Sequence, residues 1–434
     1  MKAFYLIIAL AFSLSFSYAQ DSLALQQYLQ QHKHEVALNA AHPFSFPDSF
    51  YHKQLFLTGE IHGYQKAHDL DLALFQHLHQ KAGVRHYIAE VDAAQAWHFN
   101  QYLQTGKMQH LDTVFNYWVK TGAQWGNTDY YHKLQQLYTW NRSLPRKQQI
   151  TIWGIDKIQQ LPLNIAYFDR LLADKQWQQL PLVDSVYNSL HADSIVKATC
   201  STQLQALETQ LLTHAAPYQT ALQNNFTDFT RLVNNLLVYF TNGSREQQFV
   251  NNYTAYYQQL QHAPMYGFLG FYHTIQDQVN DRYAFAGRLK NSALPVKDQM
   301  VSLNLLYMDS DIMIDATMNA MPFPPGVLPQ DKLPTIPNQS GTHQYLKTDV
   351  LSQDGMLMKI KGCDMLKAIT RPHSITIFDM QQAGPAMQQF PGFMDTQMPL
   401  PPGAWLKLNN PAGMHYQYLV LIRHSAWAAP FLNK

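Results

Sequence analysis

The most constraining stretch of this sequence is an apolar run that stops abruptly at a charged pair between two glycines. Residues 55–63 are Leu-Phe-Leu-Thr-Gly-Glu-Ile-His-Gly. An apolar run bounded by glycine is typical of a buried strand, and the carboxyl end of such a strand faces the ligand crevice in an open parallel α/β sheet. We therefore predict that Glu60 and His62 belong to an active site. The alternative is a strand-to-loop turn with solvated polar side chains.

The segment after this strand predicts a βαβ unit. Apolar residues recur at helical spacing between residues 68 and 81, and Gly83 is a suitable helix stop. Residues 84–91 then predict a second strand, whose end carries Glu90 and Asp92. A strand, a short helix and a strand in succession form a right-handed crossover, which makes the two strands parallel.

Further strands predict an α/β fold with a largely parallel central sheet flanked by helices. Residues 150–155 form an apolar strand that ends on Asp156, and residues 265–272 form one that ends on His273. Three more buried strands are predicted at residues 300–307, 374–378 and 416–422.

The pattern also divides the chain into segments. Residues 162–262 carry leucines and aromatics at helical spacing among many Gln and Asn, which predicts a helical insertion. The two halves of the α/β domain are then residues 20–161 and 263–434. Within the second half, the proline-rich residues 321–340 predict a long loop or lid, and the polar residues 23–41 at the start of the first half predict a helix.

The first 19 residues are typical of a secretory signal peptide. Lys2 supplies a positive start, residues 3–16 are almost wholly apolar, and residues 17–19 fit a small-x-small cleavage site. No later run of comparable length lacks polar residues, so no integral membrane segment is expected. We expect an exported protein, either periplasmic or secreted.

Charge and cysteine content narrow the range of partners. A formal net charge of +1 with 14% charged residues gives no sign of binding to nucleic acid or to an anionic membrane. A small-molecule substrate is the expected partner. Cys200 and Cys363 are the two cysteines, and their spacing fits no zinc site. They could form one disulfide or remain two buried thiols.

Charged residues follow four of the predicted strands. Parallel strands would bring them to one edge of the sheet, where they would perturb one another's pKa values, as acid–base catalysis requires. Alternatively, they are the polar residues that any strand end exposes to water. The sequence signatures of serine hydrolases, zincins, P-loop NTPases and dinucleotide-binding folds are missing, which leaves water activation by a histidine or a bound metal. The four strand ends carry Glu60 with His62, Glu90 with Asp92, Asp156, and His273.

Five short motifs occur in order along the first part of the chain. They are Gly-Glu-Ile-His-Gly at 59–63, Tyr-Ile-Ala-Glu-Val-Asp at 87–92, Trp125 with Asn127, Leu-Tyr-Thr-Trp-Asn-Arg at 137–142, and Trp-Gly-Ile-Asp at 153–156. Together they resemble the erythromycin esterase family, which belongs to a wider superfamily with haem-uptake and Tiki-like metal-dependent protease members. The similarity is best over residues 55–160 and fainter over residues 270–289.

The resemblance implies an esterase-like hydrolase with a defined division of roles. His62 would be the general base acting on water, Glu60 and Glu90 would orient it, and His273 would be the second catalytic histidine. No cofactor is expected in this case. In the alternative, the same four residues bind a divalent metal, or a histidine among aromatic rings binds haem, without turnover.

Three further residues are predicted to contact the substrate. Asp156 lies at a strand end, Trp125 could form a wall of the site, and Arg282 could clamp a carboxylate or phosphate. The alternatives are core packing for Trp125 and a surface salt bridge for Arg282.

Overall fold

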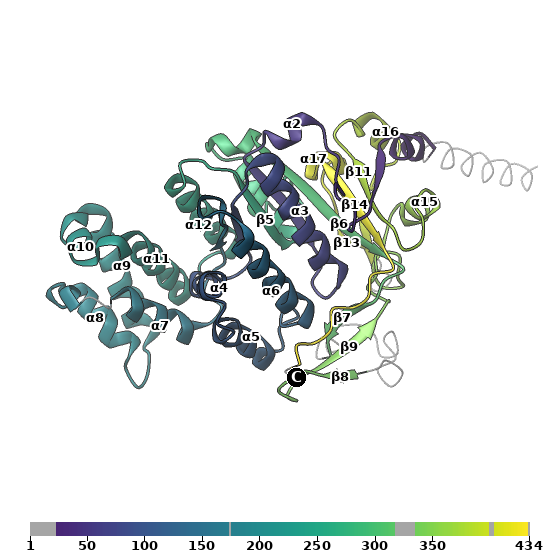
Figure 1. Cartoon of the computed structure of the whole chain (residues 1–434). Helices are drawn as coiled ribbons and strands as arrows, with labels where there is room; N and C mark the ends of the chain where they lie inside the picture. Colours follow the sequence, from purple (N-terminus) through teal and green to yellow (C-terminus); the bar gives the residue numbers. More distant parts are fainter. Residues whose placement is uncertain (1–22, 173–174, 317–334, 399–402, 433–434) are drawn as a thin grey trace, which may run out of the picture. The chain divides into compact units, whose positions relative to one another are not determined.

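The computed structural model describes residues 23–172, 175–316, 335–398 and 403–432 (Figure 1). The predicted signal peptide lies outside these residues, and so does most of the predicted loop at 321–340. Within its described end, residues 335–340, Thr335–Pro337 form strand β8. The chain divides into two compact units, unit 1 (Met1–Val84, Phe115–Trp140 and Tyr266–Lys434) and unit 2 (Arg85–Val114 and Asn141–Met265).

A mixed sheet forms the centre of unit 1. Strand β6 (Met300–Met308) pairs in parallel with β2 (Leu55–Glu60) on one side and with β14 (Tyr418–Arg423) on the other. Every residue of these three strands is buried, as expected for parallel strands that are covered on both faces. β5 (Met265–Gly270) follows β2 in the strand order. The predicted fold class, α/β with a largely parallel sheet flanked by helices, is confirmed.

The other edge of this sheet differs from the prediction. Residues 23–31 are helical as expected, but Lys33–Val36 form strand β1. β1 pairs antiparallel with β11 (Ile375–Asp379), and β11 pairs antiparallel with β14. The prediction of a helix through residue 41 was therefore wrong after residue 31, because pairing with a distant strand overrides a weak local preference.

Unit 1 also contains two small antiparallel sheets that the sequence did not predict. One has the order β7 (Ile312–Asp315), β9 (Gln344–Thr348) and β8, and the other has the order β10 (Lys359–Ile360), β12 (Thr396–Met398) and β13 (Gly403–Leu406). Their strands have two to five residues, which is too short for a clear alternating pattern. Helix α15 (Cys363–Ala368) lies in the same part of the chain.

Unit 2 combines two parallel strands with a set of helices. β3 (His86–Ala89) pairs in parallel with β4 (Thr151–Gly154), and α4 (Ala93–Thr105) follows β3. The predicted insertion at residues 162–262 is helical in the structure, although unit 2 joins it to β3 and β4. Its α-helices are α7 (Leu161–Leu171), α8 (Pro181–Leu190), α9 (Lys197–Thr213), α10 (Ala215–Leu222), α11 (Phe226–Thr241) and α12 (Arg245–Gln259).

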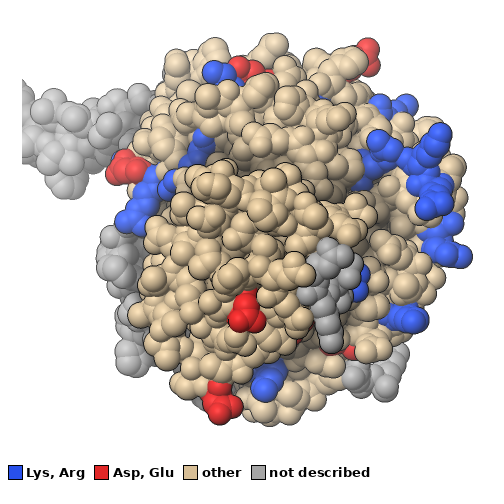
Figure 2. Space-filling model, turned by 90° about the vertical axis from the view of Figure 1, so that its left-hand side faces the viewer, with Lys and Arg blue, Asp and Glu red and all other residues tan. Residues whose placement is uncertain are grey.

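Three general features bear on function. On the face drawn in Figure 2, most surface atoms belong to uncharged residues, and charged side chains are scattered mainly along the margins. Within the described ranges, no helix combines the length and apolarity needed to cross a membrane. Cys200 and Cys363 are both buried thiols, and neither is part of a disulfide.

Candidate active site

The carboxyl end of β2 places a carboxylate and an imidazole in direct contact. Glu60 is the last residue of β2, and its Oε1 lies within hydrogen-bonding distance of His62 Nδ1. The carboxylate is almost fully buried, whereas the side chain of His62 is 26% exposed. When Nδ1–H donates to the carboxylate, the ring orientation is fixed and Nε2 becomes the basic nitrogen. The predicted pair, Glu60 and His62, therefore has the geometry of a base and the group that orients it.

The turn after His62 is held rigidly by backbone contacts. Gly63 has φ +103°, and its carbonyl accepts hydrogen bonds from Met313 N at 3.1 Å and Ala428 N at 2.7 Å. A Cβ at Gly63 would lie 2.4 Å from Met313 O, so only glycine fits. Tyr64 then stacks on Tyr307 at 3.8 Å between ring centroids. These contacts fix the chain on which His62 is carried.

An indole borders the imidazole of His62. Trp125 lies between α5 (Gln109–Thr121) and α6 (Thr128–Ser143), and its ring centroid is 5.3 Å from that of His62, edge to face. Its Nε1 is buried and has no hydrogen-bond partner among the residues that the structure describes. Trp125 thus contacts the candidate base, as a wall of the site would.

His273 lies in a short helix that packs against β2. It belongs to α13 (Phe271–Thr274), which begins directly after β5, and it is buried. A Cβ added at Gly59 would lie 2.2 Å from Thr274 Oγ1 and 2.8 Å from Phe271 Cα. Glycine at this position therefore allows the helix that carries His273 to approach the strand that carries Glu60.

We expect the substitution Gly59→Ala to destabilise the protein by about 1–3 kcal/mol, the usual cost of overpacking, because the new methyl group overlaps Thr274 Oγ1 and Phe271 Cα of α13. It should also lower activity by displacing His273. Gly384→Ala is the matched control, since a Cβ at Gly384 meets nothing within 4 Å. Urea unfolding of both variants checks the prediction, which fails if the two midpoints shift equally.

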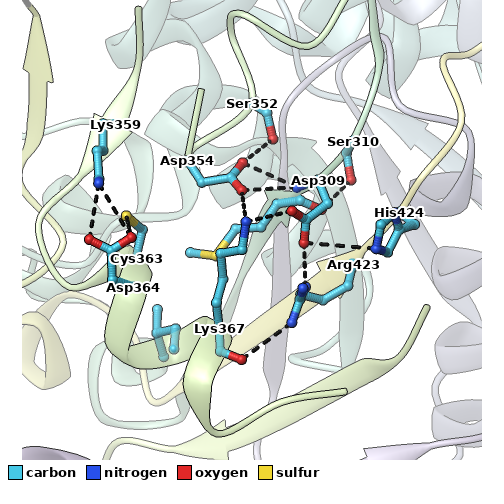
Figure 3. A network of polar contacts seen from close by, with 12 residues as sticks. Asp309, Ser310, Ser352, Asp354, Lys359, Cys363, Asp364, Lys367, Arg423 and His424 are labelled. Carbon is cyan, nitrogen blue, oxygen red and sulfur yellow. Dashed lines mark hydrogen bonds and ion pairs between the residues drawn. The ribbon is translucent and has the colours of Figure 1, made fainter. Parts of the chain in front are cut away.

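Ion pairs connect the carboxyl ends of β6 and β14 (Figure 3). Asp309, directly after β6, accepts hydrogen bonds from Arg423 Nε at 2.6 Å and from Lys367 Nζ, and Lys367 also bonds Asp354 at 2.6 Å. Burial alone would raise the pKa of Asp309, but the bonds from Lys367 and Arg423 outweigh it and lower this pKa. Two carboxylates are thus matched by two cations. The network fixes these strand ends without leaving an excess charge.

In unit 2, one arginine binds both carboxylates that follow β3 and β4. Arg245, the first residue of α12, donates from Nε to Asp156 Oδ1 at 2.8 Å and from Nη2 to Asp156 Oδ2 at 2.5 Å. The same Nη2 lies 2.7 Å from Glu90 Oε1. Burial alone would lower the pKa of Arg245, but the hydrogen bond and charge of Asp156 raise it. Arg245 was not predicted from the sequence. It is 89 residues from Asp156, and no motif distinguishes it from the other polar residues of its helix.

Two other predicted residues take different positions. Asp92 is the N-cap of α4 and forms a capping box with Gln95, while its Oδ2 accepts bonds from Gln159 N and Asn164 Nδ2. Asp92 therefore has a structural role as a buried carboxylate, and its place among the chemically active strand-end residues stays a prediction. Arg282 is exposed in a turn after α13, where its backbone pairs with Val279. Its role toward a substrate stays a prediction.

The described residues contain no group of three or more His, Cys, Asp or Glu side chains that could hold a metal ion. Glu60, His62 and His273 lie in unit 1, and Glu90 and Asp156 lie in unit 2. The polar contacts of these residues form a carboxylate–histidine pair in unit 1 and a carboxylate–arginine cluster in unit 2.

Comparison with known proteins supports the fold. No family model and no curated protein matches the chain. A solved protein from Bacillus cereus aligns over 93% of this chain and 98% of its own, with TM-score 0.63 and 13% identity. A succinoglycan biosynthesis protein aligns over 94% and 98%, with TM-score 0.59 and 12% identity. A mutant of the erythromycin esterase EreC in its open conformation aligns over 89% and 94%, with TM-score 0.57 and 11% identity. The chain therefore has the fold of an erythromycin esterase, as the sequence resemblance predicted.

Proposed function

We propose that the protein is an exported hydrolase that uses His62 to activate water and cleaves an ester or a similar bond of a small molecule. The observation that carries the proposal is the contact between the buried Glu60 carboxylate and His62 Nδ1 at the carboxyl end of β2. The shared fold with an erythromycin esterase supports the same class of reaction. Export rests on the signal-peptide pattern of residues 1–19.

The reaction follows from the basicity of His62 Nε2. This nitrogen takes a proton from water while the water oxygen adds to the acyl carbon, which gives a tetrahedral oxyanion. Glu60 stabilises the imidazolium that forms, as an acceptor on Nδ1 does in carboxylate–histidine pairs. The oxyanion then collapses, the bond from carbon to the alcohol oxygen breaks, and the imidazolium returns its proton to the leaving alkoxide. The products are a carboxylic acid and an alcohol.

The remaining residues complete this proposal. His273, on α13, would stabilise the oxyanion by donating a hydrogen bond, since a buried donor is most effective where charge develops. Trp125 would form the wall beside His62.

The experiment is a hydrolysis assay of the mature protein on a panel of chromogenic esters with acyl groups of increasing size. An absorption spectrum and elemental analysis are recorded on the same sample. We expect hydrolysis that chelators do not abolish, from a colourless protein. A haem spectrum or a bound metal at one equivalent, together with no hydrolysis of any ester, would replace the proposal by ligand binding without turnover.

A further inference from the structure

A polar cavity lies in unit 1 at the amino ends of the parallel strands. Its volume is about 160 Å³, and its lining includes Met300 and Val301 at the start of β6 and Tyr418 at the start of β14. β2 is parallel to β6, so Glu60, at the carboxyl end of β2, lies at the opposite end of the strands. The cavity is therefore separate from the candidate active site.

The size and the lining of this cavity suit a small polar molecule. Drug-sized ligands occupy pockets of about 300–1,000 Å³, so a cavity of about 160 Å³ fits a molecule the size of a single sugar ring. Three glutamines, two lysines, a serine, a tyrosine and an aspartate line it, whereas its apolar lining is confined to Phe50, Met300 and Val301. Such a lining favours a ligand that forms hydrogen bonds.

Two of the glutamines, Gln276 and Gln417, are oriented by Ser302 of β6. Gln417 Oε1 accepts hydrogen bonds from Ser302 N and from Gln276 Nε2, both at 2.9 Å. Gln276 Nε2 also donates to Ser302 Oγ at 3.0 Å, and Ser302 Oγ donates to the Thr274 carbonyl at 2.7 Å. Since a backbone N–H can only donate, the oxygen of Gln417 must face Ser302. Gln276 and Ser302 are 3% and 0% exposed, so this arrangement is built into the core.

This network leaves one acceptor and one donor for a ligand. Within the described part of the chain, no hydrogen bond uses Oε1 of Gln276 or Nε2 of Gln417. A hydroxyl group both donates and accepts, so it matches this pair of amide groups. The Tyr418 hydroxyl accepts from Gln381 Nε2 at 2.9 Å, and burial raises the pKa of Tyr418, so its own proton is kept for donation.

Two ammonium groups add positive charge to the lining. Lys53 Nζ donates to the Asp298 carbonyl at 3.1 Å, and Lys290 Nζ donates to the Lys297 carbonyl at 3.0 Å. An ammonium has three hydrogens, and each of these bonds uses one. The carboxylate of Asp298 lies 3.6 Å from Lys290 Nζ and is 69% exposed, so it offsets only part of the charge. The cavity therefore favours a ligand with a negative group.

We propose that this cavity binds a small carboxylic acid that carries hydroxyl groups, such as a single sugar acid. Lys53 and Lys290 would bind the carboxylate, and Gln276 with Gln417 would bind a hydroxyl group. The site goes beyond the proposed hydrolysis, because all of its residues lie at the amino ends of the strands and none belongs to the Glu60–His62 pair.

Calorimetric titration of the mature protein with glucuronate tests the proposal, with glucose and inorganic phosphate as comparison ligands. We expect saturable binding of glucuronate at one site. Glucose lacks the carboxylate and phosphate lacks the sugar hydroxyls, so each should bind at least about 10-fold more weakly, as the loss of a charged hydrogen bond or of several neutral ones predicts. Glucuronate should also raise the unfolding temperature. No saturable binding of glucuronate, or phosphate binding of equal affinity, would overturn the proposal.

The double variant Lys53→Met/Lys290→Met tests the role of the charge. It should weaken glucuronate binding by about 10-fold, since two partly exposed ion pairs are lost, and leave glucose binding unchanged. The control is Lys359→Met, which removes an ion pair with Asp364 at 3.0 Å outside this cavity. Equal glucuronate affinities of the double variant and the control would contradict the assignment, whatever the hydrolytic activity of either protein.

The substitution Gln417→Glu tests the hydrogen-bonding pair without breaking the network. A glutamate keeps an oxygen that can accept from Ser302 N and Gln276 Nε2, but it replaces the free NH₂ donor by a negative oxygen. Repulsion should then weaken glucuronate binding by about 10-fold or more. A urea unfolding curve shows whether the variant is folded. A folded variant that binds glucuronate as the wild type does would show that Gln417 does not contact the ligand and would overturn the proposed site.

Discussion

Replacing His62 with alanine should lower kcat for ester hydrolysis by about 100-fold or more, because a general base normally contributes at least this factor. The alanine variant keeps Glu60 but lacks the imidazole that takes the proton from water in the proposed reaction. Because this variant also removes a hydrogen-bond partner of the buried Glu60 carboxylate, it should lower the free energy of unfolding by about 1–3 kcal/mol without unfolding the protein. The measurement is kcat and KM on the best ester of the panel, with a urea unfolding curve for each variant.

Two further variants make this result specific. Glu60→Gln keeps the shape of the side chain but removes the charge that stabilises the imidazolium, so it should lower kcat with little effect on KM. The control is His191→Ala, since His191 also contacts a carboxylate, Asp169 at 3.1 Å, but on an exposed surface. His191→Ala should retain wild-type kcat. If His62→Ala does as well, His62 is not the base and the proposed function is wrong.

Strands β2 to β6, β11 and β14 were predictable from the sequence because each is a mostly apolar run. β2 and β6 are mostly apolar along their whole length, which is typical of parallel strands that are covered on both faces. β1 was not predictable, because Lys33–Val36 becomes a strand only through its pairing with β11, more than 330 residues later in the sequence.

The candidate site was predictable only where the relevant residues are neighbours in sequence. Glu60 and His62 are two residues apart, so one strand end defines their contact. Glu90 and Asp92 have the same spacing, yet Asp92 caps a helix while Glu90 binds Arg245. The sequence does not indicate this difference. Asp92 is bonded by Gln95, three residues later, whereas Glu90 is bonded by Arg245, 155 residues later.

The ion pair between Lys133 and Asp71 was not predicted from the sequence either, and breaking it has the largest expected effect on stability. Lys133 Nζ lies 2.6 Å from Asp71 Oδ2, and the two side chains are 4% and 1% exposed. Tyr266 donates a hydrogen bond to the other oxygen of Asp71 at 2.7 Å. Lys133 also lies 4.2 Å from the ring centroid of Tyr130 and 4.7 Å from that of Phe268. Both residues lie in helices, where a charged residue in the sequence is usually assigned to the solvent-exposed face.

Lys133→Met should therefore destabilise the protein by about 3–5 kcal/mol, because it leaves the buried Asp71 carboxylate without its counter-charge. The double variant Asp71→Asn/Lys133→Met should recover much of this loss, since no buried charge remains. The control is Lys290→Met, whose partner Asp298 is 3.6 Å away and largely exposed. That surface pair should contribute at most about 1 kcal/mol. Urea unfolding of the three variants measures the difference, and equal shifts for Lys133→Met and Lys290→Met would show that the buried pair does not stabilise unit 1.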